Sequence, residues 1–138
     1  MPFIIRWPTR IEPGVSEGLV NQIDFIASFA ELLNVDLAAK EARDSRSTLK
    51  TFLGDVAVGH DLMLEEANVL ALRKRDWKYI EKQNAFWAGL AQAPLLYNLA
   101  EDPSEQTNLI EQYPEKAASM AKMLEKMKLS EGIRKMSL

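Results

Sequence analysis

The chain has 138 residues, 47% of them hydrophobic and 27% charged, which is the composition of one globular domain with enough apolar residues for a core. Its 17 Lys and Arg against 20 Asp and Glu give a net charge of −3, and this argues against nucleic acid as a partner, because phosphate binding needs clustered cations. No segment approaches the roughly 18 apolar residues of a membrane span, and the absence of cysteine excludes disulfides, thiolate metal ligands and a cysteine nucleophile.

The N-terminal residues Phe3–Trp7 form an apolar run that ends at Pro8, and a turn follows at Glu12–Gly14. Three consecutive large apolar residues predict a strand covered on both faces, as in the interior of a parallel or mixed sheet. Little nearby chain is available to cover it, so we expect the chain to be a fragment with a missing partner. Residues 1–5 lack the basic and long apolar regions of a signal peptide.

Residues 16–34 allow two interpretations. The spacing of the apolar residues predicts one long helix capped by Ser16, but Gly18 would destabilise that helix by about 1 kcal/mol. Alternatively, Leu19–Ile23 is a short extended piece and Asp24 caps a helix over Phe25–Leu33. We favour the second interpretation. Residues 35–44 are polar and predict a loop, and Ser47 is expected to open a short helix that stops at Gly54.

From Asp61 onward the pattern is typical of strands. Residues 62–64 and 69–73 predict a hairpin whose turn is Glu65–Asn68, and residues 74–76 predict a second turn. Trp77–Ile80 alternates apolar and charged residues, as a half-buried antiparallel strand does. Residues 81–94 are expected to be a long loop that folds Phe86, Trp87 and Leu90 back onto the core.

The segment Leu95–Leu109 predicts a final strand that stops before Asp102–Pro103 and leads into a polar turn. There Ser104, Thr107 and Asn108 can accept hydrogen bonds from the backbone. Pro114 suits the first position of a closing helix, whose apolar stripe is Ala117, Met120, Ala121, Leu124 and Met127. The fold class we predict is therefore α+β, with a small antiparallel sheet of about four strands and helices on one face.

The single histidine, His60, stands beside Asp61 and is the main candidate for chemistry. An imidazole suits proton transfer near neutral pH or contact with a substrate. The alternative is a structural histidine in a loop that leads into a strand, and we favour that alternative. No second histidine exists, and no Asp-x-Asp or Glu-x-x-His spacing is present that would build a metal site.

Other polar groups are weaker candidates. The glycines at 14 and 18 lack the lysine and spacing of a phosphate loop, and Ser16, Ser28, Ser45 and Ser47 lack the glycines of a nucleophile elbow, so we interpret these serines as caps or surface residues. The basic triplet 73–75 could bind sulfate or phosphate, but at a turn it is more typical of a solvated edge. The methionines of the closing helix could serve a protein contact, although a helix–sheet core is the simpler interpretation.

Several segments, in the same order, resemble motifs of the sulfatases. Residues 2–14 resemble "PFIVRWPGRIKPG", residues 22–28 resemble "QIDLLPT", and residues 44–54 resemble "DGxSLLPLLLG". Residues 71–80 resemble "ALRxGDWKYI", and residues 96–109 resemble "LYNLxxDPxETTNL". Two departures are Ala27 at a usual proline and Arg75 at a usual glycine. The resemblance covers nearly the whole chain and is to the C-terminal third of an arylsulfatase, of the kind related to arylsulfatase A and N-acetylgalactosamine-6-sulfatase.

The resemblance implies hydrolysis of a sulfate ester through a formylglycine, made from Cys or Ser, and a calcium ion. It also implies that these groups lie upstream of this chain, so that we expect no catalytic residue, no metal ligand and no cofactor here, and no turnover by the chain alone. Residues 1–58 would be the end of the large α/β domain, which is alkaline-phosphatase-like, and contribute one strand and one helix. Residues 59–138 would be the antiparallel-sheet subdomain, with His60 and Asp61 as candidates for the substrate rim.

The partner we expect is the N-terminal sulfatase domain. When the chain is alone, we expect a second copy in a homodimer, in which the two chains can exchange their N-terminal segments. A different class of function is a free-standing interaction or glycan-binding module. We expect neither a nucleic acid nor a membrane partner. Full-length sulfatases are often periplasmic, secreted or lysosomal, and the sequence itself does not indicate the compartment or the sulfated substrate.

Overall fold

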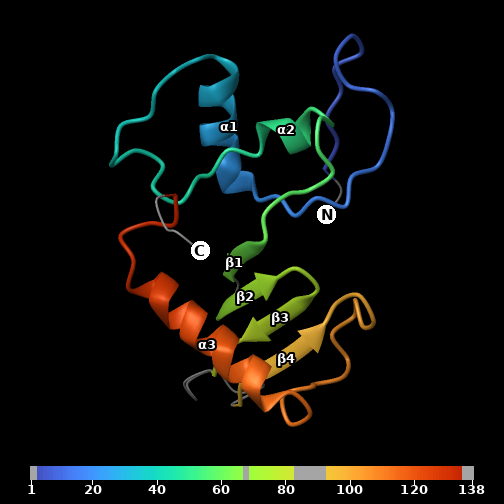
Figure 1. Cartoon of the computed structure of the whole chain (residues 1–138), viewed down its shortest axis with the longest axis vertical. Helices are drawn as coiled ribbons and strands as arrows, with labels where there is room; N and C mark the ends of the chain where they lie inside the picture. Colours follow the sequence, from blue (N-terminus) through green and yellow to red (C-terminus); the bar gives the residue numbers. More distant parts are fainter. Residues whose placement is uncertain (1–2, 67–68, 83–92, 135–138) are drawn as a thin grey trace. The chain divides into compact units, whose positions relative to one another are not determined.

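The computed structural model describes residues 3–66, 69–82 and 93–134. Contacts divide the chain into two compact units (Figure 1). The first unit is Met1–His60 with Glu131–Leu138, and the second unit is Asp61–Ser130. Our division between residues 58 and 59 concerns the assignment to sulfatase domains and remains a prediction. No helix among the described residues is long and apolar enough to cross a membrane.

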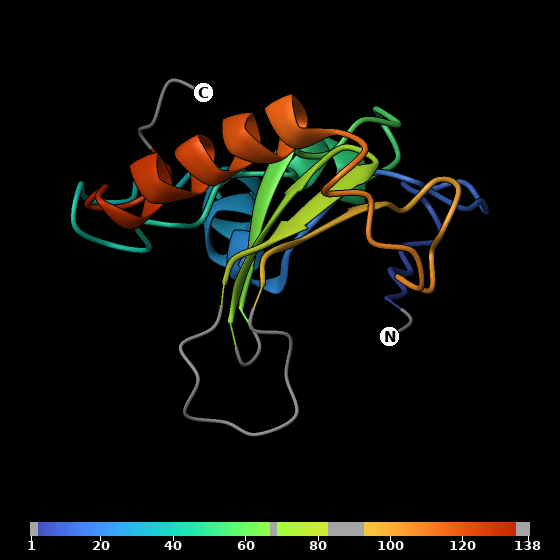
Figure 2. The same ribbon diagram turned by 90° about the horizontal axis from the view of Figure 1, so that it is seen from below.

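The second unit is the predicted antiparallel sheet with one long helix. Its strands are β1 (Leu62–Glu66), β2 (Leu70–Lys74), β3 (Trp77–Ile80) and β4 (Leu95–Asn98), ordered β1-β2-β3-β4, and its helix is α3 (Pro114–Lys128). Figure 2 shows α3 lying along one face of this sheet. The α+β class and the four antiparallel strands are therefore confirmed.

The core of the second unit follows from strand register. Leu72, Tyr79 and Leu96 are directly opposite one another on three neighbouring strands, so they share one face, and they are buried. Helix α3 begins at Pro114, as predicted, because proline has no N–H that the first turn could use. Its stripe is buried at Ala117, Met120, Leu124 and Met127.

One turn prediction is wrong in its bounds. Glu65 and Glu66 belong to β1, where they pair with Ala71 and Leu70, instead of forming the turn of the first hairpin. Antiparallel pairing continues through both glutamates because each can keep its carboxylate accessible to water at a sheet edge. Residues 67 and 68 of this expected turn, and Phe86, Trp87 and Leu90 of the expected long loop, lie outside the described residues.

The second turn of the sheet is confirmed and explains one departure from the sulfatase motif. Lys74 ends β2 and Trp77 begins β3, so the turn has Arg75 and Asp76 at its centre. Arg75 has a φ of 52°, in the left-handed region that glycine adopts most easily. The motif usually has glycine at this position, and glycine adopts this left-handed conformation easily. This chain keeps the same backbone conformation although the residue is Arg75.

The segment after β4 is held by two side chains. Asp102 Oδ2 accepts hydrogen bonds from the N–H groups of Gln106 (2.7 Å) and Thr107 (2.8 Å). Asn108 Oδ1 accepts one from Leu96 N (3.0 Å), while Leu109 N donates to Leu96 O (2.8 Å). The segment therefore covers part of the β4 edge. Asn108 acts as predicted, but Asp102 supplies the capping oxygen that we expected from Ser104 and Thr107.

The first unit contains η1 (Gln22–Asp24), α1 (Phe25–Leu32) and α2 (Leu49–Phe52). Of the two interpretations for residues 16–34, the helix that begins at Phe25 is confirmed and ends at Leu32, although no side-chain bond from Asp24 caps α1. The extended piece expected over Leu19–Ile23 is wrong at its end, because Gln22 and Ile23 belong to the 3-10 helix η1. The short helix before Gly54 is also confirmed, and Gly54 has a φ of 76°. Residues 35–44 form the predicted loop.

The strand predicted over Phe3–Trp7 is wrong for this structure. No strand is present among residues 3–60 and 131–134, the described part of the first unit. A strand needs a neighbour with which to exchange backbone hydrogen bonds, and the first unit offers none in that range. Residues 3–10 are all exposed.

The C-terminal tail belongs to the first unit. Ile133 N donates to Asp44 Oδ1 (3.1 Å), and Arg134 N donates to Arg43 O (2.9 Å). Gly132 has a φ of 138°, and a Cβ there would meet the Cβ of Arg43 at 2.6 Å. The tail therefore fits closely against the loop of residues 38–44 only with glycine at this position.

Candidate functional site

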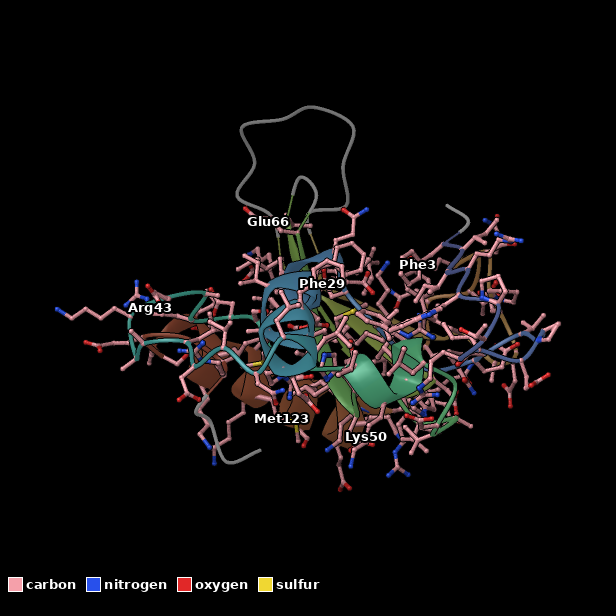
Figure 3. The ribbon with its side chains drawn as sticks, turned by 90° about the horizontal axis from the view of Figure 1, so that it is seen from above. Phe3, Phe29, Arg43, Lys50, Glu66 and Met123 are labelled. Atoms are coloured by element: carbon pink, nitrogen blue, oxygen red, sulfur yellow. The ribbon has the colours of Figure 1, made fainter. Side chains whose placement is uncertain are left out.

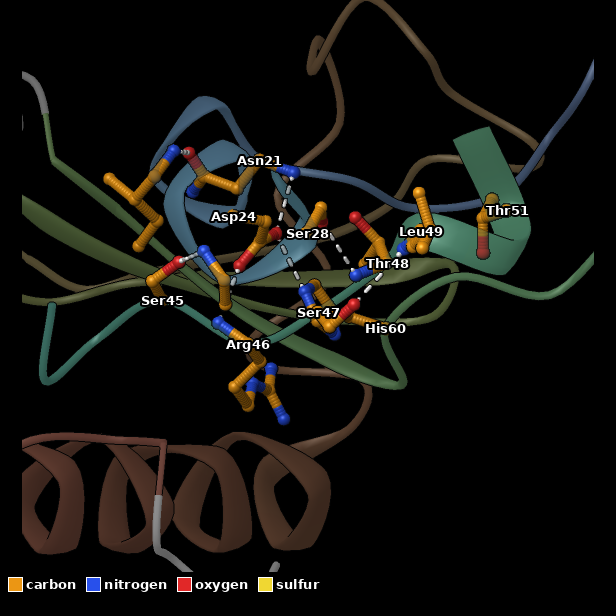
Figure 4. Close-up of polar contacts among 12 residues, drawn as sticks. Asn21, Asp24, Ser28, Ser45, Arg46, Ser47, Thr48, Leu49, Thr51 and His60 are labelled. Carbon is orange, nitrogen blue, oxygen red and sulfur yellow. Dashed lines mark hydrogen bonds and ion pairs between the residues drawn. The ribbon is translucent and has the colours of Figure 1, made fainter. Parts of the chain in front are cut away.

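A buried carboxylate, that of Asp24, is at the centre of the polar contacts in the first unit (Figure 4). Its Oδ2 accepts a hydrogen bond from Asn21 N (3.0 Å) and lies 2.7 Å from Nε2 of His60. Its Oδ1 accepts a hydrogen bond from Arg46 N (3.1 Å). The Asp24 side chain is 2% exposed and that of His60 is 10% exposed. The single histidine is therefore paired with a buried acid rather than free in a loop.

Local sequence explains how Asp24 reaches this position. Asn21 Oδ1 accepts a hydrogen bond from Ile23 N (3.3 Å), and Asp24 reaches back to the N–H of Asn21, which together form a capping box on η1. An acidic residue three positions after Asn is the sequence signal of this arrangement. Our sequence-based prediction treated Asp24 only as a cap of the following helix and missed this role.

Backbone packing explains how His60 reaches Asp24. His60 N donates to Leu19 O (2.7 Å), which fixes the approach of the two segments. At the preceding residue, Gly59, a Cβ would meet Leu19 O at 2.1 Å and Leu19 N at 2.5 Å. These distances are far below van der Waals contact, so only glycine permits this approach. Glycine at 59 is therefore a requirement of the His60–Asp24 pair.

Two buried serines join the same region to the start of α1 and α2. Ser45 Oγ accepts a hydrogen bond from Ala27 N (2.9 Å), and Ser28 Oγ accepts one from Thr48 N (3.0 Å). Both serines are buried, so their interpretation as surface residues is wrong, whereas bonding to a backbone N–H near a helix start is a capping role. Neither hydroxyl is bonded to His60 in these contacts, so no nucleophile–base pair is formed.

The chemical capacity of the region is limited. An acid that orients an imidazole is one part of many acid–base sites. His60 also lines a cavity of about 370 Å³ together with Glu31, Ser47 and Lys50. Residues 3–66, 69–82 and 93–134 contain no group of three His, Cys, Asp or Glu side chains placed to hold a metal ion. The arrangement therefore orders backbone segments and presents one imidazole at a small polar cavity.

Asp61, the other candidate for the substrate rim, contacts a different group. Its Oδ1 accepts a hydrogen bond from Arg75 Nε (2.6 Å), and both side chains are largely exposed. The hydrogen bond to Asp61 raises the pKa of the Arg75 guanidinium. His60 thus pairs within the first unit and Asp61 within the second, and their assignment to a substrate rim remains a prediction.

The basic triplet does not converge on one point. Arg73 Nε donates to Arg75 O (3.1 Å), Lys74 Nζ lies 3.8 Å from Met123 Sδ, and Arg75 is paired with Asp61. Successive strand residues point to opposite faces, so this separation follows from β2 itself. The arrangement agrees with the interpretation of a turn edge rather than an anion site.

Comparison with known proteins indicates the class of protein to which this chain is related. No protein-family model matches the chain. The N-acetylgalactosamine-6-O-sulfatase of Bacteroides thetaiotaomicron is 37% identical in an alignment of 138 positions, which covers 93% of this chain and 27% of that protein. The arylsulfatase of Hemicentrotus pulcherrimus is 30% identical in an alignment of 80 positions, which covers 56% of this chain and 14% of that protein.

Solved structures agree with these relatives. A structure from work on the metabolism of multiple glycosaminoglycans by B. thetaiotaomicron has a TM-score of 0.87 and 37% identity, and the match covers 94% of this chain and 29% of that one. A second structure, solved in complex with its substrate D-glucosamine-2-N,6-O-disulfate, has a TM-score of 0.66 at 20% identity over 91% of this chain and 27% of that one. The second match shows the fold alone.

The four-stranded antiparallel sheet and its helices are the fold of sulfatase C-terminal regions. The chain is a sulfatase homologue, and it corresponds to the C-terminal part of its relatives. It spans 27% of the length of the first of these relatives.

Proposed function

We propose that this chain is the C-terminal portion of a sulfuric ester hydrolase of the arylsulfatase type and that it does not hydrolyse sulfate esters by itself. The observation that carries the proposal is the 37% identity over 93% of the chain, combined with coverage of only 27% of the relative. An enzyme's transition-state stabilisation depends on its complete set of reacting groups and donors. A portion of this size is expected to contribute structure to that set without completing it.

The residues present do not fit the cofactors of the full-length family. Formylglycine is made from Cys or Ser, and this chain has no cysteine and no serine in the pattern "CxPSR". Calcium needs several oxygen ligands, and the described residues offer no group of three suitable side chains. We therefore propose that calcium and formylglycine belong to the remainder of the enzyme.

The natural partner we propose is the N-terminal sulfatase domain. Among the described residues, every exposed large hydrophobic side chain except Tyr113 and Leu129 lies in the first unit. On α1, the side chain of Ile26 is 56% exposed and that of Phe29 is 54% exposed (Figure 3). Leu33, which directly follows the helix, is 70% exposed. A helix that is apolar on its outer side is typical of one covered by other protein.

A second candidate is a free-standing interaction or glycan-binding module, and the same exposed apolar surface favours it over an independent enzyme. In this case the surface would be buried in a homodimer. Light scattering at micromolar concentration, with and without the N-terminal domain, distinguishes the two. A dimer that persists when the N-terminal domain is added supports the module, and a one-to-one complex with that domain supports the sulfatase portion.

The test of activity uses an aryl sulfate and a 6-O-sulfated N-acetylgalactosamine, the latter suggested by the relative's name, with calcium present. We expect no turnover by the 138-residue chain. Turnover that disappears in His60→Ala but persists in the matched surface variant Asp55→Ala would overturn the proposal. Such a result would assign catalysis to the one histidine of the chain.

A further inference from the structure

One end of the sheet in the second unit combines positive charge with aromatic surface. Lys74 ends β2 and Trp77 begins β3, and the two are directly opposite each other in the strand register, so their side chains share one face. Helix α3 lies along a face of this sheet (Figure 2), and Trp77 contacts two residues at the start of α3, Tyr113 and Lys116. We call these four residues the lysine–aromatic patch.

The two rings of the patch hold each other in a fixed arrangement. Their centroids are 5.1 Å apart and the ring planes meet at 67°, which is an edge-to-face contact. Trp77 is half-buried, whereas Tyr113 is 45% exposed. Tyr113 directly precedes α3, but its side chain forms no capping hydrogen bond. The Tyr113 ring therefore offers solvent an apolar surface that needs little further ordering when a ligand binds.

The two lysines of the patch keep an uncompensated charge. Lys116 Nζ lies 4.1 Å from the centroid of the tryptophan ring, and Lys74 Nζ lies 3.8 Å from Sδ of Met123. Neither ammonium group forms an ion pair with any residue in the described part of the chain. Two other lysines of the same unit, Lys78 and Lys128, each contact two carboxylates. An ammonium group that rests on a ring or a thioether is positioned without being neutralised, so it remains able to bind an anion.

A sulfated saccharide matches both parts of the patch. The C–H groups on the face of a pyranose ring are apolar and pack against an aromatic ring, and a sulfate group accepts charge-assisted hydrogen bonds from an ammonium group. An acidic peptide supplies the anion but has no flat face of C–H groups beside it. The combination of rings and lysines therefore favours a saccharide over a peptide.

We propose that the lysine–aromatic patch binds a sulfated polysaccharide, with a sugar ring on Tyr113 and sulfate groups on Lys74 and Lys116. The inference rests on the proposed function, because sulfate esters are the substrates of a sulfatase and the Bacteroides relative is named an N-acetylgalactosamine-6-O-sulfatase. Four side chains form a small contact, so a single saccharide unit binds weakly. A polymer presents many such units to the same patch and binds more strongly.

The charge of the chain makes this binding sensitive to single lysines. The net charge of the whole chain is −3, which repels a polyanion. Attraction must therefore come from the two lysines of the patch, and it must weaken as salt screens their charge.

The experiment is affinity electrophoresis of the full 138-residue chain in gels that contain chondroitin 6-sulfate, a polymer with 6-O-sulfated N-acetylgalactosamine. Parallel gels contain the same polymer after chemical desulfation, or poly-glutamate. The charge variants are Lys74→Gln and Lys116→Gln, and their matched control is Lys122→Gln, which removes an exposed lysine of α3 outside the patch. The ring variant is Tyr113→Ala, and its control is Tyr113→Phe, which keeps the ring. Neither change at Tyr113 removes a capping bond, so α3 is expected to remain intact.

We expect the sulfated polymer to retard the chain, and the desulfated polymer and poly-glutamate to leave its mobility unchanged. Lys74→Gln, Lys116→Gln and Tyr113→Ala should each raise the dissociation constant about ten-fold, whereas Lys122→Gln and Tyr113→Phe should change it by less than about two-fold.

Three results would overturn the patch: equal losses in Lys122→Gln and Lys116→Gln, equal retardation by the desulfated polymer or poly-glutamate, and no retardation of the unmodified chain by the sulfated polymer. Each of them leaves the proposed function intact. The proposed function fails by a different result, which is turnover of an aryl sulfate by the chain alone.

Discussion

Asp24 and His60 are 36 residues apart in the sequence, and their side chains meet at 2.7 Å in the interior of the first unit. The same carboxylate accepts hydrogen bonds from the backbone of Asn21 and Arg46. One side chain thus joins three segments that are distant in sequence. Among the described residues of the first unit, Phe52 and Ile133 are the large hydrophobic side chains that are buried, so this carboxylate links segments where the apolar core is small.

Replacement of Asp24 by Ala is expected to destabilise the first unit by about 3 kcal/mol, because two backbone N–H groups and the His60 imidazole lose their acceptor in a buried place. His60→Ala is expected to cost less, since the carboxylate keeps both backbone donors. The loss of unfolding free energy in each variant is measured by urea denaturation, with amide hydrogen exchange at residues 21–48 as the local probe. The control is Asp55→Ala, which removes an exposed ion pair of little value, and an equal loss in the control would contradict this prediction.

Gly59→Ala is expected to cost at least about 2 kcal/mol, because the added Cβ collides with the backbone of Leu19, which cannot move aside as a side chain can. The matched control is Gly14→Ala, where a Cβ meets nothing within 4 Å. There we expect no loss and a gain of up to about 1 kcal/mol from reduced freedom of the unfolded chain. Thermal unfolding of the two variants in parallel checks the comparison, and similar melting temperatures would refute it.

Arg75→Gly is expected to stabilise the second unit by about 1 kcal/mol, because Arg75 has a φ of 52° in the turn between β2 and β3. The loss of its exposed ion pair with Asp61 costs little. Arg75→Ala removes the same ion pair but retains the strained conformation, so it should give no gain. Denaturation midpoints of the two variants decide the point; a gain in both would show that the backbone conformation is not the cause.

The second unit is expected to lose stability above about pH 10. Burial raises the pKa of Tyr79 and of Tyr97 above the ordinary value of 10.0. For Lys78, burial lowers the pKa, but the hydrogen bonds that its ammonium group donates to Glu105 and Glu65 outweigh burial, so that the pKa is raised. A group with a raised folded-state pKa contributes its full stability below the unfolded pKa and loses it as pH rises through the folded pKa.

The ordinary pKa of tyrosine is about 10, so ultraviolet absorbance of tyrosinate, measured together with unfolding from about pH 8 to about pH 12, follows this loss. Tyr97→Phe should flatten the pH dependence because the ring stays but the titrating hydroxyl is gone. An unchanged slope in this variant would contradict the assignment to Tyr97.

The second unit could be predicted from its sequence because its signals are local. Alternation at Trp77–Ile80, the proline at 114 and the stripe of α3 each depend on a few neighbouring residues, and the structure contains all three. The turn at Glu65 was misplaced because strand pairing overrides the polarity of single residues at a sheet edge. Local patterns were sufficient to predict whether a segment is a helix or a strand, but they predicted the first and last residues of each element less accurately.

The first unit and its site were less predictable because their contacts join distant segments. The burial of Asp24 and its pairing with His60 follow from an approach between residues 19 and 59 that no local spacing encodes. The strand predicted at Phe3–Trp7 failed for the related reason that a strand depends on a neighbour, and the described first unit contains none. Asn21-x-x-Asp24 was the one local sign of the site.

The tail that begins at Gly132 has a consequence for the order of folding. Ile133 and Arg134 bond to Asp44 and Arg43, so this contact closes a loop that contains the whole of the second unit. The entropy lost on closing a loop grows with the length of free chain inside it. Once the sheet and α3 have formed, that free length is much shorter, so the tail contact is expected to be among the last to form and the first to open.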